Sequence, residues 1–153
     1  MNQAMQGFQQ GLVQGGKKPR MRNAIMTLLI PIIVIVAANI LGTILVIATG
    51  SAIVAQLCQL ISLVGLVLYY MPVFQMTNEV RSVTKEVPFP VWFFLIPIYG
   101  WILWFTKLPA EVAKAKQMVG AQQPVRGLIL YLLFVPYALA ADVNDIAARM
   151  PPG

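Results

Sequence analysis

Three acidic residues recur at the same kind of position in the sequence, just beyond an apolar segment. They are spaced 32 and 34 residues apart and are Glu79, Glu111 and Asp145. If the apolar segments enter a membrane, these carboxylates could form a ring at one membrane face that binds cations or a basic partner. The alternative is that a membrane helix needs a polar end and that each acid pairs with a neighbouring Lys or Arg. We favour the ion pairs.

Residues for other chemistry are scarce. The chain has no histidine, so His-based triads and the usual zinc sites are excluded, and it contains no glycine-rich phosphate loop. The single cysteine, Cys58, lies in an apolar segment, where a small buried residue is expected rather than a redox centre. We therefore predict no catalytic, cofactor-binding or metal-binding residue. A membrane-embedded enzyme that pairs a Ser with a Lys is the least favoured function.

The elements that must position the acidic residues follow from a long stretch without charge. From Asn23 to Asn78, 56 residues carry no charged side chain. One helix of that length would measure about 84 Å, nearly three times a hydrocarbon core of about 30 Å, so the chain must fold back. Because Thr49-Gly50-Ser51 has the composition of a turn, we predict two membrane spans, at residues 25–48 and 52–76.

Two further apolar segments contain proline and are expected either to cross the membrane or to re-enter it from one side. The segment at 90–106 should begin near Pro90 and bend or break within 97–100, because proline removes an amide donor and clashes with the preceding turn. The segment at 127–141 has Pro136 in its middle. As a helix it would reach only about 22 Å, which is short of the hydrocarbon core.

A short amphipathic helix is predicted between these two segments, from Glu111 to Val119. Its apolar residues recur at helical spacing, and Gly120 should end it. We expect this helix to lie on the membrane surface, where three basic side chains would reach anionic headgroups: Lys107, Lys114 and Lys116. The alternative is a helix within a solvated loop.

Small side chains recur along the second predicted span at alternating steps of four and three residues, which aligns them on one face. They are Ser51, Ala55, Cys58, Ser62 and Gly65, and a matching pair in the first span is Ala38 and Gly42. Since lipid gives helices no hydrophobic reason to associate, small residues supply contact by letting backbones approach. Three amides lie beside these stripes and should hydrogen-bond between helices or, alternatively, line a pore: Asn39, Gln56 and Gln59.

The basic residues predict an orientation. Residues 1–22 should form a disordered tail with a basic end, and that end places the N-terminus in the cytoplasm. The net charge of +6 is assigned to contact with anionic lipid, because no basic stripe with interleaved aromatics indicates nucleic acid. If the third segment crossed fully, the basic loop at 107–126 would face outward, against the positive-inside rule. A four-span chain and a chain with two re-entrant segments both remain open.

The residues Pro97-Ile98-Tyr99-Gly100-Trp101-Ile102-Leu103-Trp104-Phe105, followed by Lys107 and Glu111-Val112, form a recognisable pattern. The chain here resembles a bacterial membrane family, the domain-of-unknown-function family numbered 4234, over roughly residues 70–149. A second copy of the pattern would run from Val135 to Ile146, although no glycine follows its tyrosine. The resemblance implies a small multi-span inner-membrane protein and no particular activity.

Together these observations predict an all-α, polytopic membrane protein with a membrane domain at residues 23–149. We expect a multi-pass protein of the inner membrane that acts by helix association, as an accessory or scaffold subunit with a homo- or hetero-oligomeric membrane partner. The alternative is an oligomeric channel or transporter component.

Overall fold

Helices form the regular structure of this chain. The computed structural model describes residues 18–88 and 97–150, and within these ranges it contains no strand. The described helices are α2 (Ala24–Thr49), α3 (Ala52–Thr84), α4 (Pro97–Met118), α5 (Leu128–Leu133) and α6 (Val135–Arg149). The predicted all-helical class is therefore confirmed. Most of the predicted tail at 1–22 lies outside the described residues.

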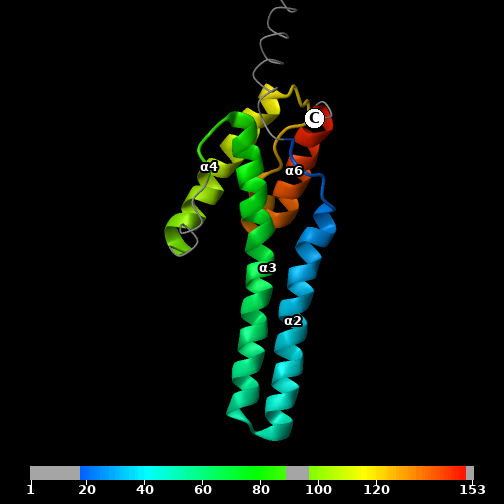
Figure 1. Cartoon of the computed structure of the whole chain (residues 1–153), viewed down its shortest axis with the longest axis vertical. Coiled ribbons are helices and arrows are strands. Elements are labelled where there is room, and N and C mark those ends of the chain that lie inside the picture. Colours follow the sequence, from blue (N-terminus) through cyan, green and yellow to red (C-terminus); the bar gives the residue numbers. More distant parts are fainter. Residues whose placement is uncertain (1–17, 89–96, 151–153) are drawn as a thin grey trace, which may run out of the picture.

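Helices α2 and α3 form a long antiparallel hairpin that extends away from the rest of the molecule (Figure 1). Asn23 begins α2, because its side-chain oxygen accepts a hydrogen bond from the amide of Met26. Gly50 ends α2 with φ 62°, a left-handed conformation that glycine adopts without steric cost. Both hairpin helices are long and apolar enough to cross a membrane.

The second hairpin helix is longer than the predicted span. It continues past residue 76 to Thr84 and ends where Lys85 adopts the left-handed conformation. Charged side chains are present in this extension, and they pair with residues of other segments rather than ending the helix. The extension of α3 thereby reaches into a compact group of helices at one end of the hairpin, which we call the head (residues 18–23, 73–88 and 106–150).

The third apolar segment is described only from Pro97 onward. Its expected start near Pro90, and with it the N-terminal side of the expected bend or break at 97–100, lies outside the described residues. From Pro97 the helix α4 continues through Pro109 to Met118. The predicted surface helix from Glu111 is consequently the C-terminal part of α4.

The fourth apolar segment, predicted at 127–141 with Pro136 in its middle, contains two helices. Phe134 leaves the helical conformation with φ −135° and ψ 48°, and the segment divides there into α5 and α6. Pro136 lies in the first turn of α6, where proline is favoured, and α6 then runs to Arg149. Neither helix is among the two candidate membrane spans found in the described residues.

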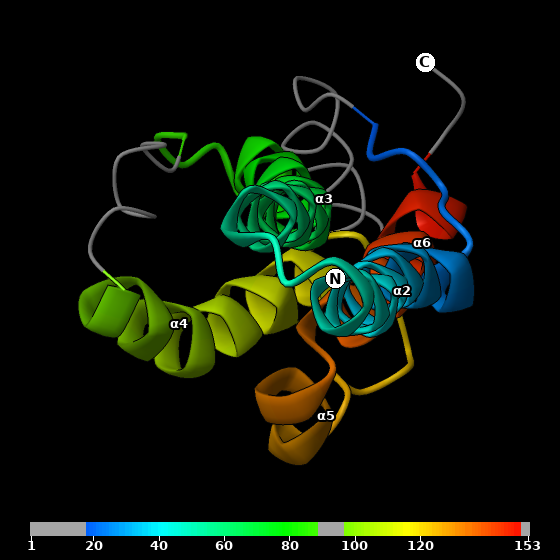
Figure 2. The same ribbon diagram turned by 90° about the horizontal axis from the view of Figure 1, so that it is seen from below.

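The head has an apolar core of its own. Residues at helical spacing on α3, α4 and α6 pack together there, and the main contributors are Val73, Met76, Val80, Leu108, Val112, Leu139, Val143 and Ile146. The view along the hairpin shows α4, α5 and α6 gathered around one end of it (Figure 2). The hairpin, in contrast, leaves most of its large apolar side chains exposed.

Candidate functional site

Ion pairs join the segments of the head across long sequence separations. Arg22, the second residue before α2, forms a two-fold bridge with Glu79 near the end of α3, with Nη1–Oε2 and Nη2–Oε1 distances of 2.7 and 2.9 Å. Fork-to-fork pairs of this kind are among the stronger charge-assisted hydrogen bonds. Arg22 therefore connects the chain entering the hairpin to the helix leaving it.

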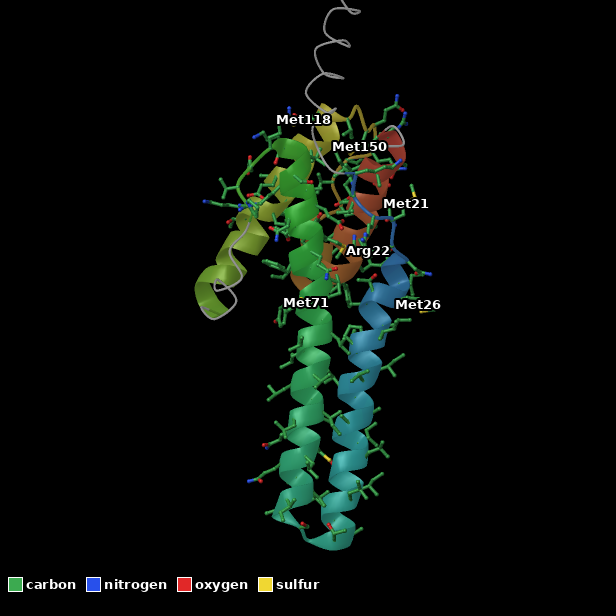
Figure 3. The ribbon with its side chains drawn as sticks, in the orientation of Figure 1. Met21, Arg22, Met26, Met71, Met118 and Met150 are labelled. Atoms are coloured by element: carbon green, nitrogen blue, oxygen red, sulfur yellow. The ribbon has the colours of Figure 1, made fainter. Side chains whose placement is uncertain are left out.

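The backbone of Arg22 is held as firmly as its side chain. Asn144 of α6 accepts a hydrogen bond from the Arg22 amide at 2.8 Å and donates one to the Arg22 carbonyl at 2.6 Å. Lys18 donates to the carbonyl of Met150 at 3.0 Å, close to the end of α6. Figure 3 labels Arg22 at this junction between α2 and the head. The segment before α2 and the C-terminal helix thus lie at the same end of the hairpin.

A second pair of bridges connects the end of α3 and the residues after it to α4. Arg81 donates from Nε and Nη2 to the carboxylate of Glu111, at 2.9 and 2.6 Å. This hydrogen bond is the first cause that raises the pKa of Arg81, and it outweighs the opposing effect of burial. Lys114 pairs with Glu86 at 2.8 Å, but this bridge is solvent-exposed and contributes little.

The most buried charges form one cluster, which we call the buried ion cluster (Lys116, Arg126, Asp142 and Asp145). Lys116 is only 3% exposed, and its Nζ lies 2.7 Å from Asp142 Oδ1 and 2.9 Å from Asp145 Oδ2. Arg126 pairs with the same two carboxylates, at 2.6 Å to Asp145. Two cations face two anions, so the charges balance where burial would otherwise make them costly.

Neutral groups complete the hydrogen bonding of this cluster. Tyr131 of α5 donates to Asp142 Oδ2 at 2.6 Å, and the carbonyl of Pro124 accepts from Lys116 at 3.2 Å. Burial, with the nearby negative charge of Asp142, raises the pKa of Tyr131, so the phenol keeps its proton and remains a donor. Burial also acts to raise the pKa of Asp145, but hydrogen bonds from Arg126 and Lys116 outweigh it and lower that pKa.

This arrangement corrects one prediction about Lys116. Its spacing predicts a side chain that reaches lipid headgroups, whereas the side chain lies inside the head between α4 and α6. The reason is that Asp142 and Asp145 stand three residues apart on one face of α6, and they offer a fixed ionic partner that headgroups cannot match. Lys107 and Lys114, by contrast, are exposed.

The three repeated acids are separated among these ion pairs. Glu79 binds Arg22, Glu111 binds Arg81, and Asp145 binds the two cations of the buried ion cluster. Each of the five acidic residues of the chain is in an ion pair of the described structure. Within the described residues, no group of three or more His, Cys, Asp or Glu side chains is arranged to hold a metal ion. Chemically, the arrangement joins the segments of the head through paired charges.

The small residues predicted for helix packing line much of the contact between α2 and α3. A Cβ added at Gly42 would lie 2.7 Å from the Cβ of Cys58, and one added at Gly65 would lie 2.4 Å from Cγ1 of Ile35. Ala38 is buried, while Ser51 and Ala55 are partly buried. Both glycines therefore permit a backbone approach that any larger residue would obstruct.

The three predicted amides do not share one surface. Asn39 donates to Ser62 across the hairpin at 3.2 Å, so this residue makes the expected contact between helices. Gln56 and Gln59 are exposed, and neither has a hydrogen-bond partner within the described residues. The interhelical hydrogen bonds predicted for these two amides are therefore not formed within the part of the chain that the structure describes.

Sequence reasoning missed several residues of the head. The residues are Asn144, Arg126, Tyr131 and Asp142, and their partners lie in other segments of the chain. One signal was available, since Asp142 and Asp145 stand on one face of a helix whose opposite residues are apolar. Comparison of the chain with protein-family models, with curated proteins and with solved structures gives no match. The resemblance to the family numbered 4234 stays a prediction.

Proposed function

We propose that this protein is a small multi-pass protein of the bacterial inner membrane, in which the α2–α3 hairpin crosses the bilayer and the head remains on the cytoplasmic side. The observation that carries the proposal is the attachment of Arg22 to both Glu79 and Asn144. These contacts tie the basic segment before α2 to α3 and α6. A cytoplasmic N-terminus then implies a cytoplasmic head.

The charge distribution supports the same arrangement. The five acidic residues pair with five of the eleven basic residues, which leaves the surplus positive charge on the others. Five of these others are exposed in the head: Lys18, Arg20, Lys85, Lys107 and Arg149. Near anionic headgroups, each basic residue contributes about 1 kcal/mol of attraction. With two spans, the basic loop at 107–126 no longer violates the positive-inside rule.

The activity that we propose is association, as an accessory or scaffold subunit. The hairpin supplies a large exposed apolar surface for lipid and partner helices. The head, whose segments are joined by ion pairs, forms a fixed structure at one end of the hairpin. A channel has less support, because Asn39 is engaged across the hairpin whereas Gln56 and Gln59 lie on its outer surface. An enzyme has less support still, because the carboxylates are already engaged.

Single cysteines in a Cys58→Ser background test the topology. A membrane-impermeant thiol reagent added to intact cells should label Gly50→Cys in the turn but not Gln122→Cys, which is exposed in the head. Permeabilising the cells should then allow labelling at position 122. Labelling of Gln122→Cys in intact cells would favour four spans and contradict the proposal. Purification in mild detergent, after crosslinking in cells, tests for association with a membrane partner.

A further inference from the structure

An apolar patch on α5 and the residue after it is left uncovered by the rest of the head. The helix packs against α6 through Tyr131, which is fully buried. Five other large side chains of this segment are between 40% and 72% exposed: Leu128, Ile129, Leu132, Leu133 and Phe134. Such a group of exposed apolar side chains on one short helix requires an apolar environment, or a partner that covers it.

The place of α5 in the fold identifies that environment. Figure 2 looks from the hairpin turn toward the head, and α5 projects to one side of the hairpin on the face of the head that is turned toward the viewer. The helix that carries the apolar patch therefore lies on the side of the head toward the hairpin.

The length and hydrogen bonding of α5 fit a position at the edge of a bilayer. Six residues make a helix about 9 Å long, which cannot cross a hydrocarbon core of about 30 Å. The amide of Leu130 donates to the carbonyl of Gly127 at 2.9 Å, and that of Phe134 donates to Leu130 at 2.8 Å. Backbone groups that are paired within the segment can enter the boundary between headgroups and acyl chains.

We infer that α5 inserts its apolar patch into the cytoplasmic leaflet. The protein is then anchored in the membrane by this partly inserted helix as well as by the hairpin. This inference rests on the proposed two-span topology. The occupant of the patch is lipid rather than protein, because α5 lies on the side of the head toward the hairpin, which the proposed topology places in lipid. The hydrogen bond from Tyr131 to Asp142 fixes the orientation of α5, since it anchors the buried side of the helix in the buried ion cluster.

Site-directed spin labelling tests the inference on the full chain in vesicles of phosphatidylethanolamine and phosphatidylglycerol. A nitroxide is attached in turn to Ile129→Cys, Gln122→Cys and Val64→Cys, each in a Cys58→Ser background. Oxygen concentrates in lipid and a nickel chelate in water, so their effects on the label report depth. At position 129 we expect oxygen to exceed the chelate, at a shallower depth than at Val64, the midpoint of the span at 52–76. At Gln122 the order should reverse.

The other outcomes separate two kinds of failure. A label at position 129 that responds mainly to the nickel chelate would overturn the inference, as would one that is shielded from both reagents, since that indicates a protein partner. A depth equal to that of Val64 would also overturn it, in favour of a spanning segment. If the label at Val64 itself responds as in water, the proposed topology fails. A label at Val64 in lipid with one at Ile129 in water rejects the α5 inference alone.

Discussion

The hairpin and the head are joined by α3, yet they are stabilised in different ways. In the hairpin, Gly42 and Gly65 allow the two backbones to come close, and a polar contact from Asn39 crosses between them. In the head, ion pairs and an apolar core hold the segments together. The hairpin therefore depends mainly on complementary shape, whereas the head also depends on its buried charge partners.

The largest effect should come from removing a charge from the buried ion cluster. Asp142→Ala removes one carboxylate that pairs with the buried Lys116, and this loss should cost about 3–5 kcal/mol of stability. Thermal unfolding in detergent, followed by circular dichroism, measures this loss. The matched control is Glu86→Gln, which opens the exposed bridge to Lys114 and should cost less than about 1 kcal/mol. Equal losses would remove the distinction between buried and exposed ion pairs.

A smaller effect should follow from adding one methyl group to the hairpin contact. In Gly65→Ala the new Cβ meets Ile35, so the two helices must separate or repack at a cost of about 1–3 kcal/mol. Leu63→Ala is the control, because the Leu63 side chain is 55% exposed. The midpoint of unfolding in detergent distinguishes the two variants. If Leu63→Ala is the more harmful one, close approach is not what holds the hairpin.

The junction between the two regions should be still less sensitive. Asn144→Ala removes both hydrogen bonds to the backbone of Arg22, which should cost about 1–2 kcal/mol. The segment before α2 should then be released from the head and be cleaved faster by trypsin after Arg22. Asn144→Asp keeps an acceptor for the Arg22 amide but loses the donor, so its cleavage rate should fall between those of the parent and Asn144→Ala. If cleavage is unchanged in both variants, the hydrogen bonds of Asn144 do not hold the segment before α2 to the head.

Acid should affect the head alone, and this is the smallest predicted effect near neutral pH. The pKa of Asp145 is lower in the folded protein than in the unfolded chain. Its carboxylate therefore stabilises the fold above the ordinary carboxyl pKa of about 3.9, and this contribution is lost as pH falls below that value. The protection factors of the α6 amides, which correct for the intrinsic pH dependence of hydrogen exchange, should fall below about pH 4, and Asp145→Asn should weaken that pH dependence. An equal loss of protection in the hairpin, which has no charged residue from 23 to 78, would contradict this division.

Features that depend on neighbouring residues are visible in the sequence alone. The turn at Gly50 and the two apolar helices beside it could be predicted because an uncharged stretch longer than a bilayer must fold back. The alternating spacing of Ser51, Ala55, Cys58, Ser62 and Gly65 likewise places these residues on one helix face. Periodicity and hydropathy are local properties, and a sequence displays them directly.

Which charges meet depends instead on the tertiary structure. The sequence around Lys116 resembles that around Lys107 and Lys114, because each is a basic residue beside apolar residues at helical spacing. Nothing in the neighbouring sequence indicates that Lys116 is buried. Its partners Asp142 and Asp145 lie 26 and 29 residues away, beyond a loop and the break at Phe134. Whether two charges form an ion pair depends on their distance in the folded structure and on the loss of water around both of them. Helical spacing along the sequence does not determine this distance or this loss of water.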